Sequence, residues 1–154
     1  MSNFNIASSL HKHGIISDEE MGKHIDKALE DKDVYMRLAA IEHPTVTPDH
    51  IDKALSDTHS WVRGAAIQHP NATAAHIDRA LNDSNAYVRK QAIQHPKATT
   101  EHIDKALDMN QPESVRVAAL GHPKVTSAHI DRAMNDKYRD VRETVMKIKK
   151  ERNL

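Results

Sequence analysis

The sequence predicts an all-α fold: an α-solenoid of about five 26-residue two-helix repeats with a cap at each end. Three recurring patterns carry this prediction. The triplet His-Ile-Asp returns at intervals of 26, 26, 26 and 27 residues, beginning at His24, His50, His76, His102 and His129. His-Pro pairs and single arginines return with the same period, at His43, His69, His95 and His122, and at Arg37, Arg63, Arg89, Arg116 and Arg142. A period of this length is typical of proteins in which each repeat packs on the next.

The first helix of a repeat is predicted to begin after Thr47. Thr is a favourable N-cap, and Pro48 then occupies the first helical position, where its missing N–H costs nothing. Ile51, Ala54 and Leu55 follow at helical spacing and form one apolar stripe. Every first helix has an alanine at one position, which favours close helix packing: Ala28, Ala54, Ala80, Ala106 and Ala133.

The second helix is predicted to follow a polar break at residues 57–60. Val62, Ala65, Ala66 and Ile67 form its apolar stripe. Pro70 ends the helix, because the residue before a proline avoids the helical region. Two helices of about eight to ten residues are marginal in water by themselves. Stacking of successive pairs therefore has to supply the hydrophobic core.

One helical-repeat domain is predicted over residues 1–154, with the repeats over 24–142. Residues 1–23 form an N-terminal cap, in which Ser17 and Glu20 fit a capping box. Residues 143–154 form a C-terminal cap, because a polar and basic run replaces the usual His-Pro ending. The fourth repeat has one extra residue near 110–112, which we expect to lengthen the loop between its helices.

Composition excludes several classes of protein. Lys+Arg and Asp+Glu are both 22, and the resulting zero net charge argues against a strongly basic nucleic-acid clamp or membrane binder. The absence of cysteine excludes disulfides, iron–sulfur clusters and cysteine nucleophiles. No apolar run approaches the length of a membrane span or a signal-peptide core, so we expect a cytoplasmic protein.

The repeat resembles the leucine-rich variant repeat. The pattern is carried by Pro70, Ile77, Leu81, Asp83, Val88, Arg89, Ile93, His95 and Pro96. Its Asp followed by Val-Arg is also similar to short HEAT-like repeats. The resemblance covers about residues 24–146 and implies an α-solenoid that serves as a binding scaffold. The chain departs from the leucine-rich variant family in having His where Asn is usual before Pro, and in lacking the cysteines of an associated iron–sulfur centre.

Histidine is abundant, with 12 residues, most of them in the two repeated patterns. Equivalent histidines on stacked helices lie about 8–10 Å apart, too far to share a zinc ion whose bonds are about 2 Å long. We therefore expect these side chains to form hydrogen bonds at helix ends, and we expect no metal and no cofactor. His11 and His13 are the one alternative, as a weakly chelating pair.

The row of arginines has two interpretations. It could bind phosphates or carboxylates along one face. It could instead pair with the aspartates of the interhelix turns and hold neighbouring repeats together. We favour pairing because an aspartate precedes most of the arginines, at Asp31, Asp57, Asp83 and Asp136. The alternating charges of the first helices, such as Asp26-Lys27 and Asp52-Lys53, are interpreted as a solvated face.

Three aromatic residues share one repeat position, two residues before the arginine: Tyr35, Trp61 and Tyr87. This position opens the second helix beside a polar turn, so we expect an exposed aromatic stripe. Tyr and Trp are frequent at binding hot spots. The alternative is that the rings cover neighbouring side chains and seal the edge.

The second helix also varies in sequence where its apolar positions do not. The residue after the arginine is Leu38, Gly64, Lys90, Val117 or Glu143, and the residue before the histidine is Glu42, Gln68, Gln94 or Gly121. Variation confined to one helix is typical of a recognition face. Relaxed selection on a solvated surface would produce the same variation.

We therefore predict a non-enzymatic scaffold that holds a protein or peptide partner on the face of the second helices. The predicted partner-binding residues are Tyr35, Trp61, Tyr87, Gln68, Lys90, Gln91 and Gln94. The alternative is a nucleic-acid-binding helical-repeat protein, suggested by the basic run from Arg142 to Arg152. No catalytic residue is predicted, since the chain lacks a Gly-rich phosphate loop and a zinc-protease motif. We expect a monomer that does not bind membranes.

Overall fold

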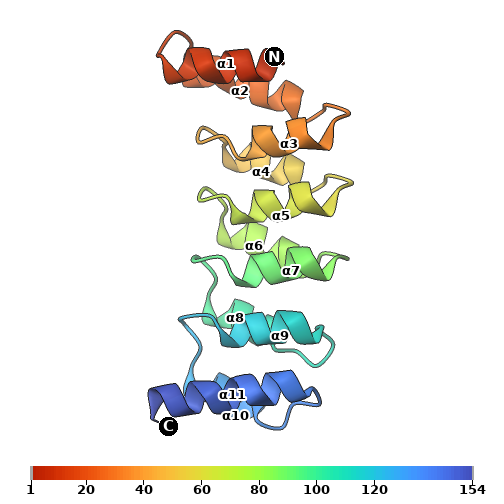
Figure 1. The fold of residues 1–154 in the computed structure, drawn as a ribbon, viewed down its shortest axis with the longest axis vertical. Helices are drawn as coiled ribbons and strands as arrows, with labels where there is room; N and C mark the ends of the chain where they lie inside the picture. The colour runs from red at the N-terminus through yellow and green to blue at the C-terminus, as the bar shows by residue number, and fades with distance from the viewer. Residues whose placement is uncertain (1, 154) are drawn as a thin grey trace. The chain divides into compact units, whose positions relative to one another are not determined.

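The computed structural model describes residues 2–153, which form eleven α-helices and no strand (Figure 1). This confirms the all-α prediction. The helices are α1 (Asn3–Lys12), α2 (Asp18–Ala28), α3 (Val34–Ile41), α4 (Pro48–Ala54), α5 (Ser60–Gln68), α6 (Ala74–Leu81), α7 (Ala86–Ile93), α8 (Thr100–Ala106), α9 (Glu113–Leu120), α10 (Ser127–Ala133) and α11 (Arg139–Arg152).

The chain divides into two compact units, residues 1–76 (unit 1) and residues 77–154 (unit 2), and the division falls within α6. In unit 1, α1 packs on α2 and α2 on α3, and Figure 1 shows α3 and α5 side by side. In unit 2, α9 packs against α7 on one side and α11 on the other. Helices α8 and α10 pack on α9 and α11, so α7, α9 and α11 form one layer of unit 2.

Helices α4, α8 and α10 each begin with a capping box in which histidine replaces the usual acid or amide. The Thr47 side chain accepts the backbone N–H of His50, while Nδ1 of His50 accepts the Thr47 N–H at 3.0 Å. Thr99 and His102 form the same box on α8, and Thr126 and His129 form it on α10. The predicted box of Ser17 and Glu20 is also present, on α2. In α4, α8 and α10 the threonine and the histidine therefore start the helix together.

The predicted apolar stripes form the cores of both units. Ile25, Ile41, Ile51 and Ile67 are fully buried in unit 1, and Ile93, Ile103, Leu120 and Ile130 are buried in unit 2. Burying one such side chain contributes about 1.5–3 kcal/mol. The first-helix alanines are buried as well. No helix in the described part of the chain is both long and apolar enough to cross a membrane.

The connection between the two helices of the fourth repeat is longer than its counterpart in the second repeat. Residues 107–112 join α8 to α9, whereas residues 55–59 join α4 to α5. The predicted extra residue therefore lies in the loop. Helix α2 begins at Asp18, so it lies on both sides of the boundary predicted after residue 23.

Candidate functional site

The histidines of the His-Pro pairs are buried, and His69 and His122 are hydrogen-bonded on both ring nitrogens. Nε2 of His69 lies 3.2 Å from the carbonyl oxygen of His43 in unit 1, and Nε2 of His122 lies 3.3 Å from that of His95 in unit 2. Nδ1 accepts a backbone N–H two residues further on, from Asn71 in unit 1. Each of these rings therefore joins one helical pair to the preceding one.

The histidines of the His-Ile-Asp triplets face the aspartate of the preceding triplet. In unit 1, His50 Nε2 lies 3.8 Å from Asp26, and His76 Nε2 lies 3.4 Å from Asp52. In unit 2, the corresponding distances are 3.5 Å from His102 to Asp78 and 3.3 Å from His129 to Asp104. These aspartates are about half exposed, and each also lies against the histidine of the next repeat.

The sequence signal for these contacts between repeats is the recurring His-Ile-Asp triplet. A first-helix histidine and the first-helix aspartate of the preceding pair recur together at every repeat. Lysines and arginines add to the same contacts: Lys105 binds Asp78, and Arg132 binds Asp104 at 2.9 Å.

Two arginines of the row pair with aspartates, as expected: Arg37 in unit 1 and Arg116 in unit 2. Arg37 donates from Nε and Nη2 to the Asp57 carboxylate at 2.6 and 3.0 Å. This hydrogen bond raises the pKa of Arg37 above its usual value. In unit 2, Arg116 donates to Asp136 at 2.6 Å. These two guanidinium groups hold neighbouring helical pairs together and are not available for an external phosphate.

The three predicted aromatic residues are exposed, each as the second residue of its helix. Tyr35 on α3 is 68% exposed and Trp61 on α5 is 53% exposed, both in unit 1. Tyr87 on α7 of unit 2 is 43% exposed. The Trp61 ring meets His59 edge-on, with the ring centroids 5.1 Å apart. Exposed rings at these positions match the expectation of an accessible surface.

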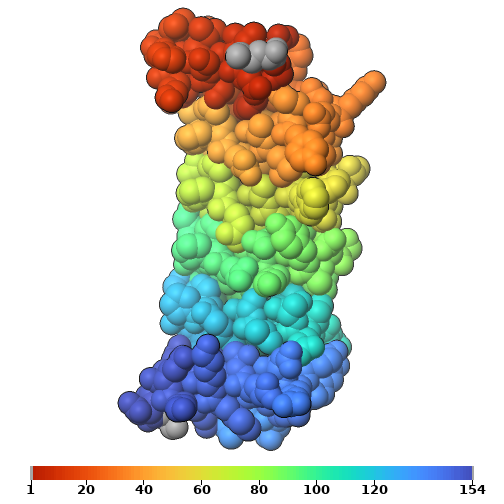
Figure 2. Space-filling view, viewed as in Figure 1, coloured from red at the N-terminus to blue at the C-terminus, as the bar shows by residue number. Residues whose placement is uncertain are grey.

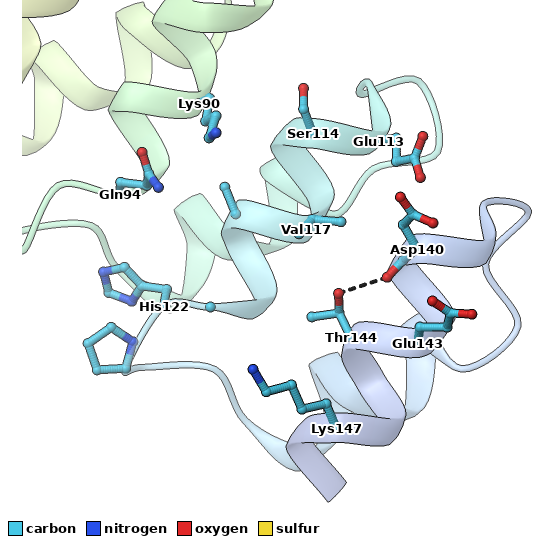
Figure 3. Close-up of a pocket in the computed structure, with 13 residues that line it drawn as sticks. Lys90, Gln94, Glu113, Ser114, Val117, His122, Asp140, Glu143, Thr144 and Lys147 are labelled. Carbon is cyan, nitrogen blue, oxygen red and sulfur yellow. Dashed lines mark hydrogen bonds between the residues drawn. The ribbon is translucent and has the colours of Figure 1, made fainter. Parts of the chain in front are cut away.

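An open groove of about 1020 Å³ lies on the layer formed by α7, α9 and α11 (Figures 2 and 3). We call it the unit 2 groove. The small residues of its lining are Val117 and Ala118 of α9 and Gly121, the C-cap residue of that helix, and we call them the groove floor. The remaining lining residues are Lys90, Gln94, Glu113, Ser114, His122, Pro123, Asp140, Glu143, Thr144 and Lys147.

The predicted partner-binding residues fall in different places. Lys90 and Gln94 line the unit 2 groove. Gln91 and Tyr87 are not part of its lining. Gln68 lines a smaller hollow of about 210 Å³ in unit 1, between α3 and α5. Sequence reasoning noted the variable positions of Val117, Gly121 and Glu143 but did not include them among the binding residues.

The unit 2 groove is lined by both acidic and basic side chains. Glu113 and Asp140, in the first turns of α9 and α11, lie with Glu143 on one side of the view in Figure 3. Lys90 lies on α7, and Lys147 lies further along α11. Arg139 does not line the groove, but it pairs with Glu143 at 2.6 Å. Burial lowers the pKa of His122 below its usual value of 6.5, which favours an uncharged ring in the groove wall.

Residues elsewhere that could carry chemistry are engaged in local contacts. His11 lies 2.6 Å from Asp18, and Nδ1 of His13 lies 2.8 Å from the Ser9 carbonyl. Between residues 2 and 153, no cluster of three or more His, Asp or Glu side chains could hold a metal ion. Lys149 pairs with Asp131, and Arg152 donates to the Val125 carbonyl, so part of the basic C-terminal run faces protein groups.

Comparison with known proteins returned no match: no family model matches the chain, and no curated protein matches it. The candidate site is therefore defined by geometry and chemistry alone.

Proposed function

We propose that the chain is a non-enzymatic binding scaffold, an α-solenoid of 26-residue repeats that holds a protein or peptide on the face of its second helices. The separation of repeated and varied residues supports this proposal. Repeated histidines, aspartates and arginines contact neighbouring helical pairs within each unit. Residues that differ between repeats line the unit 2 groove.

The groove favours an extended peptide segment of mixed charge. Glu113, Asp140 and Glu143 would attract a basic side chain, and Lys90 and Lys147 an acidic one. Small apolar groups of the peptide would cover the floor at Val117 and Gly121. A nucleic-acid backbone suits the groove less well, because its phosphates would meet three carboxylates. The peptide is therefore our first choice and nucleic acid the alternative.

Selection from a displayed random-peptide library would test the proposal. The bait is the full chain, and the counter-selection uses Gly121→Gln. Gly121 is the groove-floor equivalent of Gln68 and Gln94, and an added Cβ would meet only the Ala118 carbonyl at 3.4 Å and the Val117 carbonyl at 3.9 Å. The longer side chain therefore fills the groove with little disturbance of α9.

We expect enriched peptides that carry one basic and one acidic side chain around small apolar residues. In fluorescence polarisation, Gly121→Gln should weaken a labelled consensus peptide by about tenfold or more. Ala128→Gln, at an exposed position on α10, is the matched control and should leave affinity unchanged. Equal peptide affinity of wild type and Gly121→Gln would show that the unit 2 groove is not the binding site.

Two further measurements separate the alternatives. A triple alanine variant at Tyr35, Trp61 and Tyr87 tests the aromatic stripe, and unchanged affinity would exclude those side chains from the site. Binding of labelled DNA or RNA at low salt, with a steep loss as salt increases, would instead favour the nucleic-acid alternative.

A further inference from the structure

The buried arginine of the fourth repeat lacks partners that other members of its row have. Arg37 donates to the Asp57 carboxylate and also, from Nη1, to the carbonyls of Asp31 and Lys32 in its own turn. Arg89 and Arg142 make the same pair of carbonyl contacts. Arg116 is fully buried, and its Nη1 instead meets Asp136 and the sulfur of Met109, 3.2 Å away. Its Nε and Nη2 have no hydrogen-bond partner in the described part of the chain.

The sequence of the fourth repeat explains this shortage. Met109 occupies the turn position that Asp57 and Asp136 occupy in their repeats, two residues after the leucine or methionine that ends the first helix. The extra residue then changes the course of the 107–112 turn, so its carbonyls do not reach Arg116. Arg37 binds Asp57, which lies 20 residues further along the chain. The residue 20 positions after Arg89 is Met109, which has no carboxylate. Nε of Arg89 is likewise buried without a partner.

We propose that Met109 is a site of reversible oxidation, and that its sulfoxide supplies the oxygen acceptor missing beside Arg116. A thioether is a weak acceptor for a guanidinium N–H, whereas a sulfoxide oxygen carries substantial negative charge. Oxidation would therefore strengthen the contact between the α8–α9 turn and the buried arginine. This is the reverse of the usual effect, in which a polar sulfoxide disrupts an apolar core.

The oxidant in this proposal is a peroxide. A sulfur lone pair of Met109 attacks the terminal oxygen of the hydroperoxide and the O–O bond breaks. The proton of the attacked oxygen passes to the leaving oxygen, which departs as water or an alcohol. The sulfur is oxidised by two electrons and the peroxide is reduced by two. Enzymatic reduction by a dithiol restores the thioether: the oxygen leaves as water and the dithiol is oxidised to a disulfide.

Access and space both favour the reaction at Met109. The residue is 52% exposed, in contrast to Met21, which is fully buried. A hollow of about 180 Å³ is lined by Met109 and Asp136, together with Asp104, Asp108 and Arg132. The added oxygen therefore has room beside the ion pair of Arg116 and Asp136.

The test treats the full chain with hydrogen peroxide and follows each methionine by peptide mass mapping and the whole protein by thermal unfolding. We expect Met109 to gain one oxygen and the unfolding midpoint to rise by roughly 2–4 °C. Methionine sulfoxide reductase should reverse both changes. Met109→Leu, which cannot be oxidised at this site, controls for oxidation of the exposed Met134 and Met146.

Met109→Gln provides a second measurement that needs no oxidant, since its amide oxygen is an acceptor at a similar distance along the side chain. We expect its midpoint to exceed that of Met109→Leu. The proposal is overturned if Met109 stays reduced at doses that oxidise Met146, or if its oxidation lowers the midpoint. Equal midpoints for Met109→Gln and Met109→Leu would also count against it.

Discussion

The Arg37 guanidinium and the Asp57 carboxylate form two hydrogen bonds between helical pairs of unit 1, at 2.6 and 3.0 Å, with both side chains almost buried. The same carboxylate accepts the backbone N–H of His59 at 2.7 Å and so shapes the turn before α5. One aspartate therefore joins two helical pairs and orders the turn within one of them.

Replacing Asp57 with alanine should destabilise the protein by roughly 3–5 kcal/mol, because it leaves the Arg37 charge buried without its carboxylate. Urea unfolding followed by circular dichroism measures the change. Asp31→Ala is the matched control: Asp31 makes the equivalent turn hydrogen bond, to the Asp33 amide, but is exposed. Similar losses in the two variants would show that the turn, and not the ion pair, carries the stability.

Replacing Met109 with aspartate should stabilise the protein by about 1.5–3 kcal/mol, the range for hydrogen bonds to charged groups. The new carboxylate would lie beside Arg116, where two buried N–H donors lack partners. The measurement is the urea midpoint relative to Met109→Leu. A midpoint no higher than that of the leucine variant would contradict the assignment of these donors as unsatisfied.

Stability should fall as the solution becomes mildly acidic. Burial lowers the pKa of His43 and of His122 below 6.5, so the unfolded chain binds more protons than the folded one below that value. This contribution is present in full above about pH 6.5 and is lost as the pH falls toward the folded-state pKa values. Urea midpoints measured across this range for wild type and for a His43→Gln/His122→Gln variant isolate the effect. If both proteins lose the same stability as the pH falls, groups other than His43 and His122 cause the loss.

Removing one capping threonine should cost about 1 kcal/mol. In Thr47→Ala, the His50 N–H at the start of α4 loses its side-chain acceptor. Thr58→Ala is the control, because Thr58 is an exposed residue of the next turn whose backbone carbonyl, not its side chain, receives Arg63. Thermal unfolding compares the two, and an unchanged midpoint for Thr47→Ala would mean that α4 is held by packing alone.

The candidate site could be predicted only in part. Lys90 and Gln94 were identified because their repeat positions vary, and both line the unit 2 groove. Val117 and Gly121 form its floor, yet a small apolar residue and a glycine carry no binding signal in a sequence. These small residues leave a space on the surface of α9. The space becomes a groove only because α7 and α11 pack on either side of α9.

The sequence by itself determined the helices, their caps and their buried positions. These features depend on spacings within a few residues, such as Thr47 before Pro48 or Ile51 before Leu55, and local geometry converts them directly into structure. The tertiary structure decided which polar groups meet: Asp26 with His50, Arg116 with Met109 and Asp136. Those contacts join residues that are distant along the chain or depend on the course of one lengthened turn, so the packing of the helices, and not their composition, brings them together.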